Sequence, residues 1–282
     1  MQISKSLNTT EKSNFGFDGK VALITGSARG IGKTIATAIG HAGAHVAICD
    51  INQAVAEASV KELKESGIDA TYFATDLSQK GGPQRMISEV AEKLGRLDIL
   101  VNNARAGKRL EPSEDTEENW DMTMSVGLKA SYFASLKAIS IMETLGGGNI
   151  VNIGSVSAFL ISGESAAYHV SKSGLTQLTK YLAVHAGSKQ IRVNSVLPGF
   201  IVQDEHRDRY NSSDNIKYRT RAEQCHPLKR VGYSQEVADA TLFLCSEAAS
   251  FITGQEIIVD GGLTIQDQWA VLSAKPPTPD KT

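Results

Sequence analysis

A glycine-rich turn between an apolar run and a helical pattern constrains this chain more than any other feature. The apolar run covers residues 21–24, and Gly26, Gly30 and Gly32 follow it. Without a Cβ atom, the backbone can turn tightly from strand to helix, approach a diphosphate closely and pack the helix against the strand. The N-terminus of that helix offers free N–H groups and a partial positive charge to phosphates. The turn therefore predicts a dinucleotide site.

An acidic residue at the end of the second apolar strand strengthens this prediction. The strand covers residues 45–49 and ends at Asp50, about twenty residues after the turn, where a carboxylate accepts hydrogen bonds from an adenosine ribose. A glycine-rich turn alone also occurs in ordinary strand-to-helix loops. Here the strand, the helix and the acid occur together, and this combination favours a cofactor site.

Composition excludes several functional classes. The 282 residues carry a formal charge of −2 without a long basic run, which argues against a nucleic-acid surface. The three cysteines are too few and too scattered for a disulfide framework or a zinc site, and the histidines show no paired metal spacing. Residues 1–14 are polar, unlike a signal peptide, and no segment is apolar enough to span a membrane. We expect a cytoplasmic protein without metal, nucleic-acid or membrane partners.

Alternating strand and helix patterns predict one α/β domain, a doubly wound Rossmann domain with a parallel sheet flanked by helices. The domain is expected to cover residues 15–265, with flexible segments at 1–14 and 266–282. A long helix is expected from about 116 to 144. Residues 200–230 lose the periodic pattern and leave the carboxyl end of the sheet, so we expect an irregular substrate lid there.

Asp76 and Leu77 follow the third apolar strand. In a doubly wound sheet the ligand lies along the carboxyl ends of the strands, so Asp76 is a candidate for contact with an adenine. The alternative is that Asp76 caps a helix expected from about 79 to 94.

Tyr168 and Lys172 stand four residues apart on one expected helix, so both side chains lie on the same face. A phenol with its ordinary pKa of about 10 is a poor base at neutral pH, but a neighbouring ammonium favours the phenolate. Tyr168 can then exchange a proton with an alcohol or carbonyl while a hydride passes to or from a nicotinamide. Ser155 ends a neighbouring strand, and its hydroxyl can hold the substrate oxygen. These three residues predict a hydride-transfer site.

Further motifs accompany these residues and together resemble the classical short-chain dehydrogenase/reductase family over about residues 17–264. The motifs are Thr25-Gly26-x-x-x-Gly30-Ile31-Gly32, Asn102-Asn103-Ala104, Ser155, Tyr168-x-x-x-Lys172, Pro198-Gly199, and Gly254-Gln255 with Asp260-Gly261-Gly262. The resemblance implies a seven-stranded parallel sheet of order 3-2-1-4-5-6-7 and a homotetramer. It also implies that Tyr168 is the catalytic acid and base, that Ser155 orients the carbonyl, and that Lys172 assists Tyr168 and binds the nicotinamide ribose.

The same resemblance implies a set of cofactor contacts. It places Ile31 near the phosphates, Asp76 and Leu77 beside the adenine, Asn103 beside the adenosine ribose and Ile201 beside the carboxamide. The predicted cofactor-binding residues are therefore Gly26, Arg29, Gly30, Ile31, Asp50, Asp76, Leu77, Asn103, Tyr168, Lys172 and Ile201. Asp50 would repel a 2′-phosphate and is followed by Ile51 rather than a cation, whereas Arg29 is a residue type that also occurs in NADP-binding relatives. NAD is the predicted cofactor, and NADP is the alternative.

Two positions depart from the family pattern. Arg105 stands where a glycine commonly follows Asn-Asn-Ala. It is a candidate for holding a substrate carboxylate or phosphate through paired hydrogen bonds, and the alternative is a solvated loop cation. Gly127 stands where the family usually has an asparagine that relays protons. We therefore leave Gly127 out of the catalytic set.

The sequence predicts an NAD-dependent oxidoreductase that interconverts a secondary alcohol and a ketone. A polar substrate, such as a sugar, polyol or hydroxy acid, is expected because the predicted lid contains several arginines and lysines and few large apolar residues, although its acids weaken that argument. One alternative is a 3-oxoacyl thioester (acyl-carrier-protein) reductase that uses NADPH. Another is a cofactor-binding scaffold without catalysis.

Overall fold

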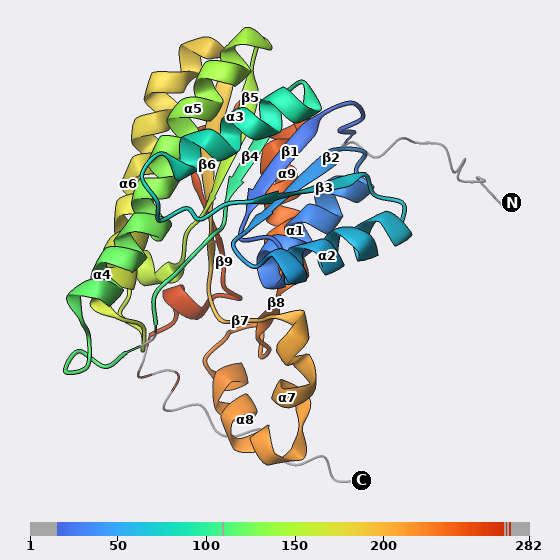
Figure 1. The fold of residues 1–282 in the computed structure, drawn as a ribbon. Coiled ribbons are helices and arrows are strands. Elements are labelled where there is room, and N and C mark those ends of the chain that lie inside the picture. Colours follow the sequence, from blue (N-terminus) through green and yellow to red (C-terminus); the bar gives the residue numbers. More distant parts are fainter. Residues whose placement is uncertain (1–15, 109, 268, 270, 272–282) are drawn as a thin grey trace, which may run out of the picture.

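A seven-stranded parallel sheet forms the centre of the molecule (Figure 1). The computed structural model describes residues 16–108, 110–267, 269 and 271. The strand order is β3-β2-β1-β4-β5-β6-β9, which confirms the predicted doubly wound order, with β9 as the seventh strand of this sheet. The strands are β1 (Val21–Thr25), β2 (His45–Asp50), β3 (Ala70–Ala74), β4 (Ile99–Asn102), β5 (Gly148–Ile153), β6 (Ile191–Pro198) and β9 (Glu256–Val259).

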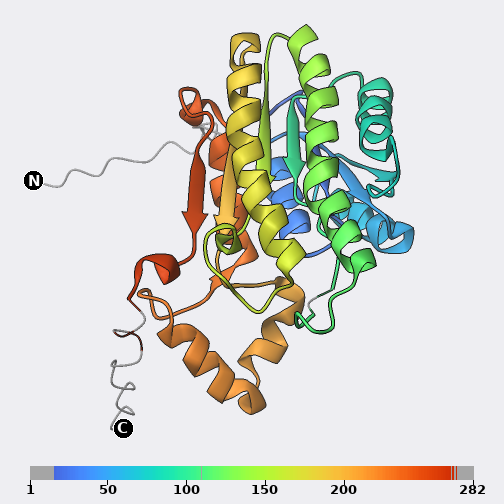
Figure 2. The same ribbon diagram turned by 90° about the vertical axis from the view of Figure 1, so that its left-hand side faces the viewer.

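Helices cover both faces of the sheet (Figures 1 and 2). The helices α1 (Gly30–His41), α2 (Gln53–Glu65) and α9 (Ser234–Cys245) contribute to one hydrophobic core, and α3 (Gly82–Leu94), α5 (Ala130–Thr144) and α6 (Ala166–Ala186) contribute to the other. The interior strand β1 contributes side chains to both cores. Its Ala22 and Ile24 enter the first, while Val21 and Leu23 enter the second, as the alternation of side chains along a strand requires.

The helix that we expected from about 116 to 144 is not uniform. It consists of α4 (Glu117–Met124), a π-helical segment (Ser125–Lys129) and α5. Gly127 lies inside the π-helical segment, where a Cβ atom would come 3.3 Å from the Ser171 hydroxyl of α6. Single π-helical turns of this kind are common at functional sites. They are too short to change the hydrophobic period of the sequence, so the sequence did not predict this one.

The segment at 200–230 is not irregular, and this expectation was wrong. It contains α7 (Arg207–Asn211) and α8 (Ile216–Gln224), and a short parallel pair connects β7 (Ile201–Val202) to β8 (Gly232–Tyr233). Val202, Tyr210 and Val231 form a small core of their own. Figure 1 shows α7 and α8 below the carboxyl ends of the sheet. These elements are too short to produce a hydrophobic period over the usual window of about 11 residues or more.

The predicted flexible segment at 1–14 lies outside the described residues, as does most of the predicted tail at 266–282. Within the described part of the chain, none of the helices has the length and apolar character needed to cross a membrane. The same residues hold no cluster of His, Cys, Asp and Glu side chains with the geometry of a metal site.

The strand β1 offers a test of the packing. Ile24 is completely buried in β1, so Ile24→Ala should lower the free energy of unfolding by about 2–5 kcal/mol through lost burial and the cavity left behind. Ile161→Ala is the matched control because Ile161 is 88% exposed. Denaturant titration at a fixed protein concentration measures both variants. Equal changes in the two would contradict the assignment of Ile24 to the core.

Candidate functional site

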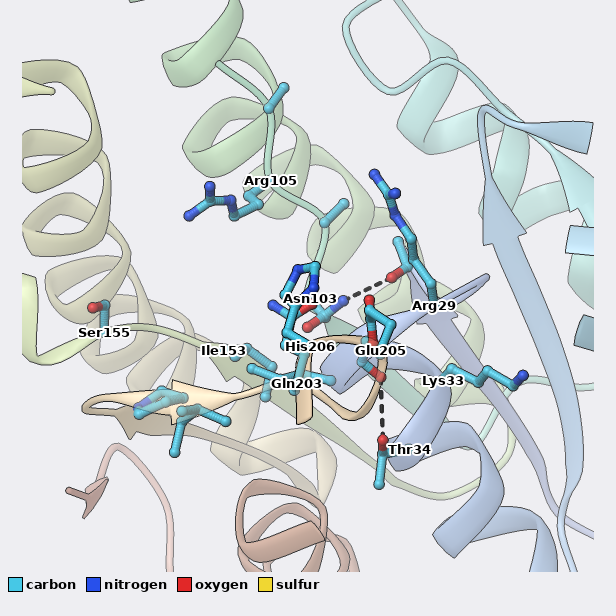
Figure 3. A pocket seen from close by; sticks show the side chains of 18 of the residues that line it. Arg29, Lys33, Thr34, Asn103, Arg105, Ile153, Ser155, Gln203, Glu205 and His206 are labelled. Atoms are coloured by element: carbon cyan, nitrogen blue, oxygen red, sulfur yellow. Dashed lines mark hydrogen bonds between the residues drawn. The ribbon is translucent and has the colours of Figure 1, made fainter. Parts of the chain in front are cut away.

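A large cleft of about 1930 Å³ runs along the carboxyl ends of the strands (Figure 3). All of the site residues predicted from the sequence line it. They are Gly26, Arg29, Gly30, Ile31, Asp50, Asp76, Leu77, Asn103, Arg105, Ser155, Tyr168, Lys172 and Ile201. Figure 3 shows Ser155 and Arg105 towards one side of the cleft, and Arg29 and Lys33 towards the other. The structure therefore brings the predicted cofactor and catalytic residues into one space.

The glycine-rich turn has the geometry expected for a phosphate cradle. Gly26 and Gly30 adopt left-handed conformations, with φ of +63° and +57°, and a Cβ atom on Gly32 would lie 2.4 Å from the carbonyl oxygen of Gly26. Arg29 is the N-cap residue before α1 and has an extended backbone. Among the described residues, its side chain makes no capping hydrogen bond to the helix. The first N–H groups of α1 are therefore open to an anion, which fits a dinucleotide diphosphate.

Asn103 connects this turn to the end of β4. Its Nδ2 donates hydrogen bonds to the carbonyl oxygens of Thr25 (2.9 Å) and Gly26 (3.0 Å). The Thr25 hydroxyl in turn accepts from the backbone N–H groups of Asn103 (2.9 Å) and Ala104 (3.0 Å). The Asn103 amide nitrogen thus holds the glycine-rich turn in place, a function that the motif did not suggest.

Two acids lie at the other end of the cleft. The Asp50 carboxylate accepts hydrogen bonds from the backbone N–H groups of Ala28 (3.3 Å) and Asn52 (3.1 Å), which fixes it beside the turn. Asp76 accepts from the Ser78 hydroxyl (2.6 Å) and backbone N–H (2.9 Å), and these bonds hold the pKa of Asp76 below its ordinary value. The helix α3 begins only at Gly82, so Asp76 does not cap it, and that alternative was wrong.

Ser155, Tyr168 and Lys172 meet where β5 ends and α6 begins. Ser155 follows β5, and its Oγ accepts from the Ser157 N–H (3.1 Å). The Ser165 side chain caps α6 by accepting from the Tyr168 N–H, and Lys172 lies one turn later on the same face. The Lys172 Nζ donates to the carbonyl oxygen of Ile153 (2.7 Å) and lies 5.6 Å from the centre of the Tyr168 ring.

The Lys172 ammonium is held in a buried position. Burial is the main cause that lowers the pKa of Lys172 to about 8, and the Arg105 guanidinium contributes further because the two groups carry like charges. The hydrogen bond to Ile153 partly offsets the loss of water around the ammonium.

His169, the neighbour of Tyr168, has a structural position. Its Nδ1 lies 2.8 Å from the Ser165 carbonyl oxygen, and its Nε2 accepts from the Ser162 N–H (3.0 Å). It thereby fastens the loop between Ser155 and Tyr168 to α6.

Arg105 lies beside Tyr168 at the mouth of the cleft. Its Cζ is 5.4 Å from the centre of the Tyr168 ring, and its Nη1 is 3.6 Å from the Glu164 Oε1. Glu164 also lines the cleft, but the sequence analysis missed it. An acid just before the N-cap of a helix is usually explained by the helix dipole, so its position carried no signal for a site.

Gln203 is a second residue that the sequence analysis missed. A Cβ atom on Gly30 would lie 2.5 Å from the Gln203 Oε1, so this side chain packs directly on the glycine-rich turn. The neighbouring Asp204 lies 3.4 Å from the Thr34 hydroxyl of α1. This contact joins residues that lie far apart in the sequence, so the sequence held no local signal for Gln203.

Comparison with known proteins identifies the family. The family model described as enoyl-(acyl carrier protein) reductase matches residues 26–264. The D-threitol dehydrogenase of Mycolicibacterium smegmatis is 35% identical over 256 residues, covering 90% of this chain and 96% of the relative. The chain belongs to the short-chain dehydrogenase/reductase family. As such, this short-chain dehydrogenase/reductase binds a nicotinamide cofactor and acts on CH–OH groups of a small molecule.

Solved structures resemble this short-chain dehydrogenase/reductase along most of its length. A gluconate 5-dehydrogenase from Burkholderia cenocepacia, in complex with NADP and tartrate, is 30% identical with a TM-score of 0.82 and covers 91% of this chain and 99% of its own. A 3-oxoacyl (acyl-carrier-protein) reductase from Agrobacterium tumefaciens with NADP bound is also 30% identical, with a TM-score of 0.82 and coverage of 90% and 97%.

The titration of Lys172 tests the electrostatics of the site. In the free protein, Lys172 should lose its proton near pH 8, and Arg105→Met should move this titration to higher pH because it removes a repelling charge. The Cε resonance of ¹³C-labelled lysine, assigned with Lys172→Met, reports the titration. Lys108→Met removes an exposed charge from the same loop and should leave it unchanged. A titration that Arg105→Met does not move would rule out the coupling.

Proposed function

We propose that this enzyme is an NAD-dependent dehydrogenase that interconverts a secondary alcohol and a ketone on a polyhydroxylated small molecule. The observation that carries the proposal is the arrangement within one cleft. Ser155, Tyr168 and Lys172 meet at one end, and Asp50 stands beside the glycine-rich turn at the other. A dinucleotide that spans the cleft would have its adenosine near Asp50 and its nicotinamide near Tyr168.

In the proposed mechanism, the Tyr168 phenolate takes the proton from the substrate alcohol and becomes the neutral hydroxyl. In the reverse direction, that hydroxyl gives its proton to the carbonyl oxygen of the substrate. The Ser155 hydroxyl donates a hydrogen bond to the same oxygen and orients it. Lys172 places a positive charge behind the Tyr168 ring and favours its anionic form. A nicotinamide cofactor, when bound, supplies the hydride acceptor or donor.

The proposed cofactor contacts follow the cleft. Gly26, Arg29, Gly30 and Ile31 surround the open N-terminus of α1 and would hold the diphosphate, with Asp76, Leu77 and Asn103 towards the adenosine and Ile201 towards the nicotinamide. Two features support NAD over NADP. Asp50 presents a carboxylate where a 2′-phosphate would lie, and the nearby Lys33 is paired with Glu62.

A polar substrate is supported by the wall of the cleft around Tyr168. Ser157, Ser162, Glu164 and Arg105 line this wall, and His206 and Arg209 line the cleft from the lid segment. Relatives named for threitol and gluconate oxidation act on polyhydroxylated compounds. The alternative, an NADPH-dependent 3-oxoacyl thioester reductase, is supported by the structural neighbour from Agrobacterium tumefaciens, and Asp50 argues against it.

We also propose a cytoplasmic homotetramer. Large apolar side chains on α5 and α6 are exposed, among them Leu136, Tyr181 and Val184. Apolar surface of this kind commonly marks contacts between subunits. The three cysteines are free thiols, which suits a reducing compartment.

The role of Tyr168 can be tested directly. Tyr168→Phe should lower kcat by about 10²–10⁴-fold through loss of proton transfer, while NADH binding changes little. Turnover is measured with NAD over a panel of polyols, aldoses, sugar acids and hydroxy acids. Tyr181→Phe alters a partly exposed tyrosine further along α6 and is the control. A Tyr168→Phe variant with full activity would mean that another group transfers the proton.

The choice of cofactor depends on Asp50. Asp50→Asn removes the carboxylate that would face a 2′-phosphate, so the ratio of kcat/KM for NADP to that for NAD should rise about tenfold or more. Asp69→Asn alters an exposed acid near the other end of β2 and should not change the ratio. If the wild type already prefers NADP, the assignment of NAD fails.

A further inference from the structure

The side chain of Gln203 lies over Gly30, the glycine at the start of α1. A Cβ atom on Gly30 would come 2.5 Å from the Gln203 Oε1 and 3.5 Å from the Glu205 Oε1. Both Gln203 and Glu205 line the cleft. Figure 3 shows them between Ser155 on one side and Arg29 on the other. The segment after β7 therefore places an amide and a carboxylate in the middle of the cleft.

This contact distinguishes Gly30 from the other two glycines of the turn. A Cβ atom on Gly26 would come 2.9 Å from the Ala104 Cα, and one on Gly32 would come 2.4 Å from the Gly26 carbonyl oxygen. Backbone atoms thus fill the space beside these two glycines permanently. The nearest atoms to Gly30 are instead the ends of flexible side chains, with that of Gln203 closest. The space over Gly30 can therefore be emptied by side-chain rotation alone.

A dinucleotide diphosphate needs the same space. In the glycine-rich turns of dinucleotide sites, one glycine allows the tight turn, one lets the helix pack on the strand, and one lets the diphosphate approach the backbone. Gly26, with a φ of +63°, and Gly32, packed against it, fit the first two functions. Gly30 is left for the third. A diphosphate at the N-terminus of α1 and the Gln203 amide therefore compete for one position.

The Gln203 side chain is held by packing, whereas the backbone around it is fixed. Among the described residues, the side-chain amide makes no hydrogen bond. The backbone carbonyl oxygen of Gln203 accepts from the His206 N–H (2.9 Å). On either side, Val202 is buried in the small core of this segment, and Asp204 pairs with Arg207 (2.9 Å). A ligand that displaces the amide therefore has to move one side chain and not the backbone.

The Glu205 carboxylate adds an effect of charge. It is exposed and, within the described part of the chain, forms no ion pair. A negative charge close to Gly30 opposes the approach of a diphosphate, and salt weakens this opposition because the carboxylate is exposed. The N–H groups at the start of α1 attract the same diphosphate. The helix N-terminus and the segment after β7 therefore act on it in opposite directions.

We propose that Gln203 is a gate over the diphosphate position. Its side chain covers Gly30 in the arrangement that the structure shows, and it turns away when a nicotinamide dinucleotide binds. This inference rests on the proposed cofactor contacts at the N-terminus of α1 and adds a residue that works against them. The apparent affinity for the cofactor is then reduced by the fraction of molecules in which the gate is open.

Binding of NADH, ADP and adenosine to the protein, measured by calorimetric titration, tests the gate. Gln203→Ala should lower the Kd of NADH and of ADP about threefold to tenfold, because no amide then covers Gly30. Adenosine, which carries no phosphate, should bind the variant and the wild type equally. Gln235→Ala is the matched control, because Gln235 also lines the cleft but donates its amide N–H to the Asp239 carboxylate (2.8 Å). This control should leave all three Kd values unchanged.

The gain should appear in the rate of association. Side-chain rotation is fast, on the scale of picoseconds to nanoseconds, so the gate only reduces the fraction of free protein that can bind. Gln203→Ala should therefore raise the association rate constant of NADH about threefold to tenfold and leave its dissociation rate constant unchanged. Stopped-flow measurement of NADH fluorescence gives both constants.

Charge is tested with variants of similar size. Gln203→Glu keeps the length of the side chain and adds a negative charge, so it should raise the Kd of ADP about tenfold. Glu205→Gln removes a charge and should lower that Kd, most clearly at low salt. Asp208→Asn alters an exposed acid on α7 and should leave it unchanged. Circular dichroism of each variant shows that the fold is retained.

The outcomes separate the gate from the proposed function. If Gln203→Ala leaves the Kd of NADH and ADP unchanged or raises it, the gate is wrong and the cofactor site stands. An equal gain for adenosine, or a gain confined to the dissociation rate, also overturns the gate. If ADP does not compete with NADH in the wild type, the cofactor contacts proposed at α1 are wrong, and the gate falls with them.

Discussion

The hydrogen bonds between Asn103 and the glycine-rich turn join the two halves of the site. The Asn103 amide nitrogen, just after β4, donates to the carbonyl oxygens of Thr25 and Gly26 at the end of the neighbouring strand β1. The glycine-rich turn and the loop that carries Arg105 are therefore held at a fixed distance. A side chain at Gly26 or Gly32 would push these segments apart, because each Cβ would come within 3 Å of backbone atoms. The absence of side chains here is thus as important as the hydrogen bonds.

The family resemblance implied the sheet order, whereas the convergence of the site could be predicted from the residues by a simple rule. Apolar runs mark buried parallel strands, and polar residues after such strands meet at one edge of the sheet. Glu164 and Gln203 were missed because their importance depends on contacts across the cleft, with Arg105 and with Gly30, that no local pattern encodes. The helices α7 and α8 were missed because short polar helices owe their stability to a small tertiary core rather than to periodicity.

Two positive charges lie next to the Tyr168 ring, and they differ in burial. Lys172 and Arg105 lie at similar distances from the ring, yet one is buried and the other faces the cleft. Burial makes the Lys172 charge sensitive to its surroundings, and the backbone carbonyl of Ile153 keeps it in one position. Arg105 is half exposed at the cleft, and its Nη1 lies 3.6 Å from the Glu164 Oε1. The two cations near this phenol thus differ in solvation, since Lys172 is enclosed by the protein and Arg105 is half exposed.

The apolar character of β1 on both faces has a consequence for how the chain finds its alignment. A strand that alternates polar and apolar residues resists a slip of one residue, since the slip would expose its apolar side. In β1, a slip of one residue would again place apolar residues in both cores, so hydrophobicity alone hardly fixes the register of this strand. Polar contacts at the two ends of the strand fix the register. The Val21 N–H donates to the Asp98 carboxylate (2.9 Å), and the Asn103 amide donates to the carbonyl oxygens of Thr25 and Gly26. The hydrogen bonds between Asn103 and the glycine-rich turn therefore also help to fix the register of β1.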